Sequence, residues 1–133
     1  MMLQLYVHAD AEADLENLWE TDEAAAATIE VTLEEIKADQ GLLDALTDHD
    51  FGVDRSNSVF HVNKWISMWR SGKDLWRLKV WELETGPNRW RVVYAFFPAE
   101  QRYYVLGVVP REFNYDAEHP ISKRILAAYE KLR

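Results

Sequence analysis

Three segments in the second half of the chain alternate between residue types, and this pattern limits the fold more than any other feature of the sequence. They cover residues 75–82, 89–97 and 102–110 and read LWRLKVWE, RWRVVYAFF and RYYVLGVVP. Alternation with period two predicts β-strands, because neighbouring side chains of a strand point to opposite faces of a sheet. Residues 85–88 (TGPN) and 98–101 (PAEQ) between them are typical of turns. The sequence therefore predicts a meander of three antiparallel strands.

The flanking segments predict one more strand and several helices. Residues 3–8 (LQLYVH) alternate like a strand, whereas residues 11–19 and 23–39 place apolar side chains at helical spacing. Thr21 or Asp22 is expected to cap the second helix, and Gly41 to end it. A last helix is predicted from Pro120 to about Leu132. We therefore expect a single α+β domain over residues 1–133, with a small antiparallel sheet, two amino-terminal helices packed on one face and a carboxy-terminal helix.

The segment over residues 41–70 has a weaker pattern. Its stretch DHDFGVDRSN (residues 48–57) indicates a loop. A short helix that ends at Gly72 is predicted by the spacing of Val62, Trp65, Ile66 and Trp69. The segment leaves three interpretations open: an added lid, a partner site, or packing alone.

Composition excludes several kinds of chemistry. The chain of 133 residues has no cysteine, which removes disulfides, thiolate nucleophiles and cysteine-based zinc sites and agrees with a reducing, cytoplasmic location. The four histidines are far apart in the sequence, and no Gly-rich phosphate loop or nucleophile-elbow motif is present. No apolar run reaches the roughly 20 residues that a membrane span needs. We therefore expect no cofactor, no metal and no membrane partner.

Charge is divided unevenly along the chain. Residues 1–54 hold one Lys or Arg against fifteen Asp or Glu, a net of −14, and residues 55–133 hold fourteen against eight, a net of +6, which together give the overall −8. A basic half of this kind favours a polyanion-binding surface, although two ordinary solvated faces would give the same numbers.

The strand pattern gathers the positive charges on one face of the predicted meander. The core face is predicted to hold Trp76, Leu78, Val80, Trp90, Val92, Tyr94, Phe96, Tyr104, Leu106 and Val108. The opposite face then receives Arg77, Lys79, Arg89, Arg91 and Arg111. Exposed sheet faces often carry such charges for solvation alone. Anion binding is favoured here because few acidic residues fall within the strands to pair with these cations.

The order of motifs around this face resembles a known family. Arg70 precedes a strand that reads WRLK (residues 76–79), and the next strand reads WRVVY (residues 90–94). The third strand is followed by Arg111, Tyr115 and a helix start that reads KRIL (residues 123–126). Over residues 70–129 this arrangement resembles the carboxy-terminal half of RelE-type toxins, within the RelE/ParE toxin superfamily.

The resemblance implies a toxin of a type II toxin–antitoxin system that cleaves mRNA on the ribosome, without a metal, and so inhibits translation. In such cleavage the ribose 2′-hydroxyl attacks the adjacent phosphorus, so the enzyme must align the chain, offset charge and move protons. The resemblance implies catalytic roles for Lys79, Arg91, Arg111 and Tyr115. It implies substrate binding by Arg70 and Arg77, and the strand pattern adds Arg89 and Trp81 on the same side.

Two alternatives remain at the level of sequence. The first is a ParE-like protein that cleaves nothing and binds a protein target such as gyrase, because the superfamily hosts both behaviours on one fold. The second is an inactive regulatory homologue, which the acidic first half of the chain would suit. The toxin interpretations also imply a cognate antitoxin protein as partner.

Overall fold

The computed structural model describes residues 2–86, 89–113 and 115–133. The described residues form a sheet, five α-helices and three short 3-10 helices. In chain order these elements are β1 (Gln4–Val7), α1 (Ala9–Thr21), α2 (Glu23–Lys37), α3 (Gln40–Ala45), β2 (Phe60–Lys64), α4 (Ile66–Arg70), β3 (Leu75–Val80), η1 (Trp81–Thr85), β4 (Trp90–Phe97), η2 (Pro98–Glu100), β5 (Arg102–Pro110), η3 (Arg111–Phe113) and α5 (Pro120–Leu132).

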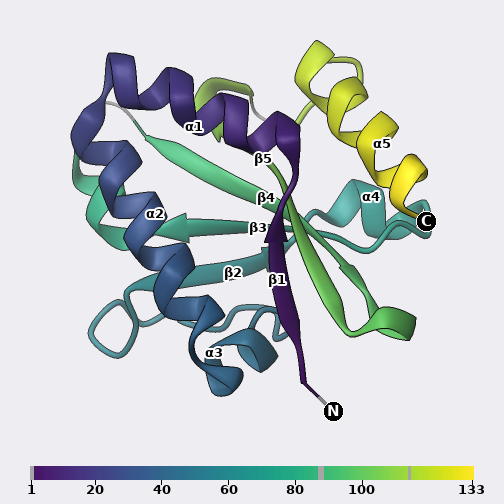
Figure 1. Ribbon diagram of the computed structural model, residues 1–133, viewed down its shortest axis with the longest axis horizontal. Coiled ribbons are helices and arrows are strands. Elements are labelled where there is room, and N and C mark those ends of the chain that lie inside the picture. Colours follow the sequence, from purple (N-terminus) through teal and green to yellow (C-terminus); the bar gives the residue numbers. More distant parts are fainter. Residues whose placement is uncertain (1, 87–88, 114) are drawn as a thin grey trace.

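The sheet has five strands in the order β1-β5-β4-β3-β2 (Figure 1). The predicted antiparallel meander β3–β4–β5 is confirmed, and so is the carboxy-terminal helix. The α+β class agrees with the expectation, but the sheet differs from the small antiparallel one predicted: it has five strands and is mixed, because β1 pairs with β5 in parallel. This follows from the two helices after β1, which cross one face of the sheet and let the first strand lie beside the last.

The second difference is β2, a strand that was not predicted. Its sequence FHVNK alternates with period two and pairs antiparallel with β3. Val62, assigned to a short helix from its spacing with Trp65, belongs to this strand, and the helix itself is confined to α4. Gly41 likewise does not end the second helix, which stops at Lys37, and lies instead within α3. Asp22 caps α2 as expected, accepting a hydrogen bond from the backbone N–H of Ala25.

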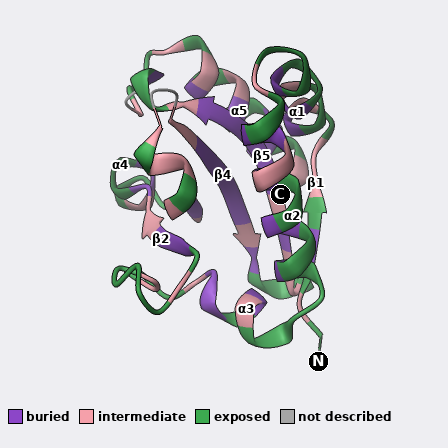
Figure 2. Ribbon diagram, turned by 90° about the vertical axis from the view of Figure 1, so that its left-hand side faces the viewer, coloured by how far each residue is buried: buried purple, intermediate pink, exposed green. Residues whose placement is uncertain are grey.

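Helices cover both faces of the sheet. Figure 2 shows α1 and α2 on one side of β4 and α4 on the other. The core under α1, α2 and α3 includes Leu15, Leu18, Ile29, Leu33, Ile36, Leu43, Trp76, Leu78, Val92, Tyr94 and Tyr103. The core under α4 and α5 includes Trp65, Met68, Leu75, Val93, Ala95, Leu106, Val109, Ile125 and Tyr129. Burial on both faces explains why β4 is apolar at nearly every position.

A β-bulge in β5 reverses the faces expected for part of that strand. Val93 pairs with Gly107 and Tyr94 with Val105, so Leu106 is an extra residue. Tyr104 and Leu106 therefore pack in the core under α5, and only Val108 lies on the predicted face. Asp14 of α1 stabilises the bulge, because its carboxylate accepts from the Val108 N–H at 2.9 Å and pairs with Arg124 of α5 at 2.7 and 2.9 Å.

The predicted loop before β2 runs along the free edge of that strand. The Asp50 N–H donates to the Val62 carbonyl at 2.8 Å, and the Val62 N–H donates to the Phe51 carbonyl at 2.9 Å. Asp50 and Gly52 adopt positive φ angles of 69° and 77°. The loop thus covers the edge of the sheet with backbone hydrogen bonds. Of the two predicted turns, residues 98–101 turn as expected, whereas residues 87 and 88 of the first lie outside the described residues.

Candidate functional site

The face of the sheet under α4 and α5 is apolar at one end and polar at the other. Along β3, Leu75 packs in the core, whereas Arg77 and Lys79 on the same face are half-buried and do not belong to that core. The pairing register places Lys79 between His61 of β2 and Arg91 of β4. The polar end is therefore built from three adjacent strands, whose pleat aims these side chains to one side.

This polar end forms a hollow of about 130 Å³. Its walls are Asn63, Arg77, Lys79, Arg91, Arg111 and Tyr115. Five of these six residues belong to the set expected from the sequence. The first cations come from β3 and β4, and the chain after β5 returns to the hollow with Arg111 and Tyr115. We call this site the cationic hollow.

Three other residues expected at the site lie outside the hollow. Arg70 is exposed at the end of α4. Arg89 is half-buried before β4, and its carbonyl accepts from the backbone N–H of Arg111. Trp81 lies at the end of β3, where its ring stacks on His61 at 5.4 Å between centroids and lies 5.2 Å from the Lys79 ammonium. Trp81 is thus adjacent to the hollow through Lys79.

One cation of the hollow is already paired. The Arg91 guanidinium forms a hydrogen-bonded ion pair with Glu84 of η1, and both side chains are 11% exposed. The expectation that the cations of this face lack acidic partners is therefore wrong for Arg91. The sequence pattern placed Glu84 after the end of β3, but η1 directs its side chain toward Arg91 of β4. Among the described residues, no carboxylate lies within 4.0 Å of Arg77, Lys79 or Arg111.

The hollow perturbs the titration of Lys79. Burial lowers the pKa of the Lys79 ammonium, and the positive charge of Arg91 lowers it further, whereas Glu84 acts in the opposite direction. Arg77 and Arg111 add smaller effects that favour the neutral amine. A lowered pKa increases the fraction of the Lys79 amine that is neutral at a given pH.

Tyr115 packs against aromatic side chains at the side of the hollow. Its ring packs edge-on against Trp65 at 5.3 Å and Phe113 at 4.9 Å, and the Arg77 guanidinium lies 4.8 Å from its centroid. Its backbone φ is +56°, a conformation that non-glycine residues rarely adopt outside constrained sites. Burial raises the pKa of Tyr115 to about 12, so the hydroxyl stays protonated. That hydroxyl is buried and has no hydrogen-bond partner among the described residues.

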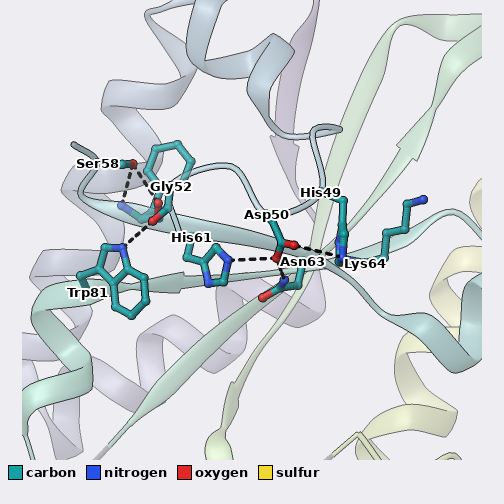
Figure 3. Close-up of polar contacts among 9 residues, drawn as sticks. His49, Asp50, Gly52, Ser58, His61, Asn63, Lys64 and Trp81 are labelled. Atoms are coloured by element: carbon teal, nitrogen blue, oxygen red, sulfur yellow. Dashed lines mark hydrogen bonds and ion pairs between the residues drawn. The ribbon is translucent and has the colours of Figure 1, made fainter. Parts of the chain in front are cut away.

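Asn63 connects the hollow to a polar network that sequence reasoning missed (Figure 3). The Asp50 carboxylate accepts from the Asn63 side-chain amide at 2.9 Å and lies 3.4 Å from His61 Nε2. Trp81 donates its indole N–H to the Gly52 carbonyl at 2.9 Å. The alternation of FHVNK was the available signal, because it places His61 and Asn63 on one face, but no sequence spacing relates them to Asp50.

A larger groove of about 460 Å³ lies elsewhere, between α2 and the end of β3. Its lining is largely apolar and includes exposed Val31 and Val59. Arg55 is the single cation among its described lining residues, whereas four cations line the smaller hollow. We assign the chemistry to the cationic hollow, because reactive groups converge there and not in the larger groove.

The comparisons with known proteins add no identification. No protein-family model, curated relative or solved structure matches this chain. Within the described parts of the chain, no cluster of three potential metal ligands occurs. No helix in those parts has the length and apolar character that crossing a bilayer requires. The functional argument therefore rests on the geometry and chemistry of the cationic hollow.

Proposed function

We propose that this protein is a metal-independent endoribonuclease that cleaves mRNA, the toxin of a type II toxin–antitoxin pair of the RelE/ParE kind. The observation that carries the proposal is the convergence of Arg77, Lys79, Arg91, Arg111 and Tyr115 on one hollow. A concave cluster of cations beside a buried phenol suits cleavage of a phosphodiester, because that reaction needs charge neutralisation and two proton transfers.

Each residue of the hollow named above has its own role in the proposed reaction. The neutral amine of Lys79 takes the proton of the 2′-hydroxyl, and the O2′–P bond forms as the P–O5′ bond breaks. Tyr115 donates its proton to the departing 5′-oxygen, which leaves a 2′,3′-cyclic phosphate and a 5′-hydroxyl. Arg91 and Arg111 offset the charge of the phosphorane, and Arg77 holds the strand. Arg70 has no direct part in this scheme, because it lies outside the hollow.

The test compares cleavage by the wild type with variants inside and outside the hollow. Induced expression in a bacterial host is followed by growth, translation and mapping of mRNA 5′ ends, and purified protein is incubated with RNA in a chelator. We expect arrest and new mRNA ends with the wild type, and loss of about 100-fold or more in cleavage rate for Lys79→Ala and Tyr115→Phe. Arg70→Ala is the matched control and should retain activity. Undiminished cleavage by Lys79→Ala would reject the scheme.

One observation favours a second candidate function. Because Glu84 pairs with Arg91, part of the positive charge of the hollow is already neutralised within the protein. A ParE-like protein that binds a target such as gyrase needs no free phosphate site, and Arg91 would then be structural. Growth arrest without new mRNA ends would support this alternative, and no arrest at all would support an inactive regulatory homologue.

A further inference from the structure

Asn63 is the one uncharged, non-aromatic residue among the described walls of the cationic hollow. It lies on β2 directly opposite Arg77 in the pairing register. We propose that the side-chain carbonyl of Asn63 accepts a hydrogen bond from a ribose 2′-hydroxyl, so that the hollow selects RNA over DNA. This inference rests on the proposed function and names the chemical feature of the substrate that the same site recognises.

The orientation of the Asn63 amide follows from its partner. Nδ2 donates to the Asp50 carboxylate at 2.9 Å. An ionised carboxylate only accepts hydrogen bonds, so the nitrogen and not the oxygen of the amide must face Asp50. Figure 3 shows the Asn63 oxygen directed away from Asp50. No described residue donates a hydrogen bond to that oxygen, which leaves it to a bound molecule or to water.

The backbone of Asp50 is anchored to β2, which keeps its half-exposed carboxylate beside the Asn63 amide. The Asp50 N–H donates to the Val62 carbonyl at 2.8 Å, and its backbone has a φ of 69°. The same carboxylate oxygen that accepts from Asn63 lies 3.4 Å from Nε2 of buried His61. Rotation of the amide would bring two acceptors together and lose a hydrogen bond, so the carbonyl is preorganised.

A fixed acceptor among four cations has few partners in a nucleic acid. Phosphate oxygens are acceptors and bind the arginines and the lysine, not the Asn63 carbonyl. The donor nearest to every phosphate is the ribose 2′-hydroxyl, which DNA lacks. Base amino groups also donate, but they lie farther from the phosphate that the cations hold. The chemistry of the hollow therefore favours a 2′-hydroxyl as the partner of Asn63, and it is that of a neighbouring nucleotide, because the single proton of the reacting hydroxyl goes to Lys79.

The test measures binding of three labelled oligonucleotides of one sequence: RNA, 2′-fluoro-RNA, which keeps a ribose-like pucker without the O–H, and DNA. Affinities are taken at one salt concentration and at times before cleavage, with intact strand checked on a gel. We expect the wild type to bind RNA about three- to tenfold more tightly than 2′-fluoro-RNA, the contribution of one neutral hydrogen bond. Asn63→Ala should abolish that difference and leave affinity for 2′-fluoro-RNA unchanged.

The controls separate this inference from the proposed function. Asn57 also donates its amide to a nearby aspartate, Asp54, at 3.1 Å, but is exposed outside the hollow, so Asn57→Ala should keep the preference. Equal binding of RNA and 2′-fluoro-RNA by the wild type, or a preference that survives in Asn63→Ala, overturns the inference and leaves the nuclease proposal standing. A wild type that binds none of the three overturns both. If Asn63→Ala does not fold, Asp50→Ala is measured instead. Loss of the Asp50 carboxylate lets the Asn63 amide rotate, so the preference for RNA over 2′-fluoro-RNA should decrease.

Discussion

At the scale of single residues, the four cations of the hollow are not equivalent. Arg91 is buried and shares its charge with Glu84, whereas Arg77, Lys79 and Arg111 have no carboxylate within 4.0 Å among the described residues. Glu84 orients Arg91 and at the same time weakens its attraction for an anion. Glu84 therefore holds Arg91 in position but reduces the positive potential that Arg91 contributes to the hollow.

Replacing Glu84 tests this balance. We expect Glu84→Gln to bind single-stranded RNA more tightly, because the net charge of the hollow becomes more positive. We also expect it to lose about 1–2 kcal/mol of unfolding free energy, because a charge-assisted bond becomes a neutral one. Titration with labelled RNA and urea unfolding measure the two effects. Glu82→Gln, an exposed neighbour on η1, should change neither by a comparable amount. Weaker RNA binding by Glu84→Gln would contradict this account.

A second prediction at this scale concerns His61 and pH. Burial lowers the pKa of His61, Lys79 and Arg77 lower it further, and the hydrogen bond and charge of Asp50 oppose the shift. Because the folded pKa lies below the ordinary value of about 6.5, the unfolded chain takes up the proton first as pH falls. His61 therefore contributes stability above about pH 6.5 that is lost as pH falls through the lowered pKa.

The measurement is unfolding free energy between pH 7.5 and pH 5 for the wild type and His61→Phe. Phenylalanine keeps a ring that can stack on Trp81 but does not titrate. We expect the stability of the wild type to fall more steeply than that of His61→Phe on acidification. Parallel curves for the two proteins would show that His61 does not titrate differently on unfolding.

At the scale of elements, the segment along the outer edge of β2 supports the polar network that adjoins the hollow. It carries Asp50, which fixes Asn63, and the Gly52 carbonyl, which accepts from Trp81. Gly52 has a φ of 77°, and a Cβ there would overlap the Phe60 carbonyl oxygen. The segment therefore approaches β2 at this point as only glycine allows.

Gly52 and Gly72 have nearly equal φ angles, so a comparison of the two separates the cost of backbone strain from the cost of this close contact. Gly72 has a φ of 79°, but a Cβ there meets nothing within 4 Å. We expect Gly72→Ala to cost about 1 kcal/mol, the penalty of a left-handed alanine, and Gly52→Ala to cost at least about 2 kcal/mol more because the edge segment must move. Urea unfolding of both variants checks the difference, and equal losses would contradict a role for the close approach. Movement of the segment should also change the fluorescence of Trp81.

At the scale of the whole molecule, the acidic helices α1 and α2 and the cationic hollow lie on opposite faces of the sheet. The acidic helices α1 and α2 cover one face (Figures 1 and 2), whereas Arg77 and Lys79 of the hollow project from the face that also packs under α4 and α5. An acidic protein of net charge −8 can therefore still present a positive surface to a polyanion. The negative face would repel RNA and orient the approaching strand toward the hollow.

Salt dependence of binding tests this separation of charge. Three cations without a carboxylate partner suggest about three phosphate contacts, so the logarithm of the RNA association constant should fall with the logarithm of salt concentration with a slope of about −2. Arg111→Ala should reduce the magnitude of that slope by about 0.7, and Arg70→Ala should leave it unchanged. The series is measured from 50 to 300 mM salt by fluorescence anisotropy. A slope near zero would exclude a phosphate-binding role for the hollow.

Prediction from sequence succeeded where a signal is local and failed where a contact joins distant segments. The alternation of β3 and β4 placed Arg77, Lys79 and Arg91 on one face, because the pleat alone determines that relation. The same reasoning failed for Tyr104 and Leu106, because the bulge in β5 shifts the alternation and leaves no reliable mark in the sequence. It also missed Asn63, since β2 is short and was grouped with the following helix.

The sequence by itself determined the three-strand meander, the last helix and the cationic face, because the periods of strands and helices appear in the order of apolar and polar residues along the chain. Only the tertiary structure decided the parallel pairing of β1, the pairing of Glu84 with Arg91 and the contact of Asp50 with Asn63. Each of these joins groups that no fixed spacing relates: a strand with the far end of the chain, a 3-10 helix with the next strand, and a loop with a sheet edge. Such contacts follow from how the elements pack, and they set the charge of the hollow and the direction of its one amide acceptor.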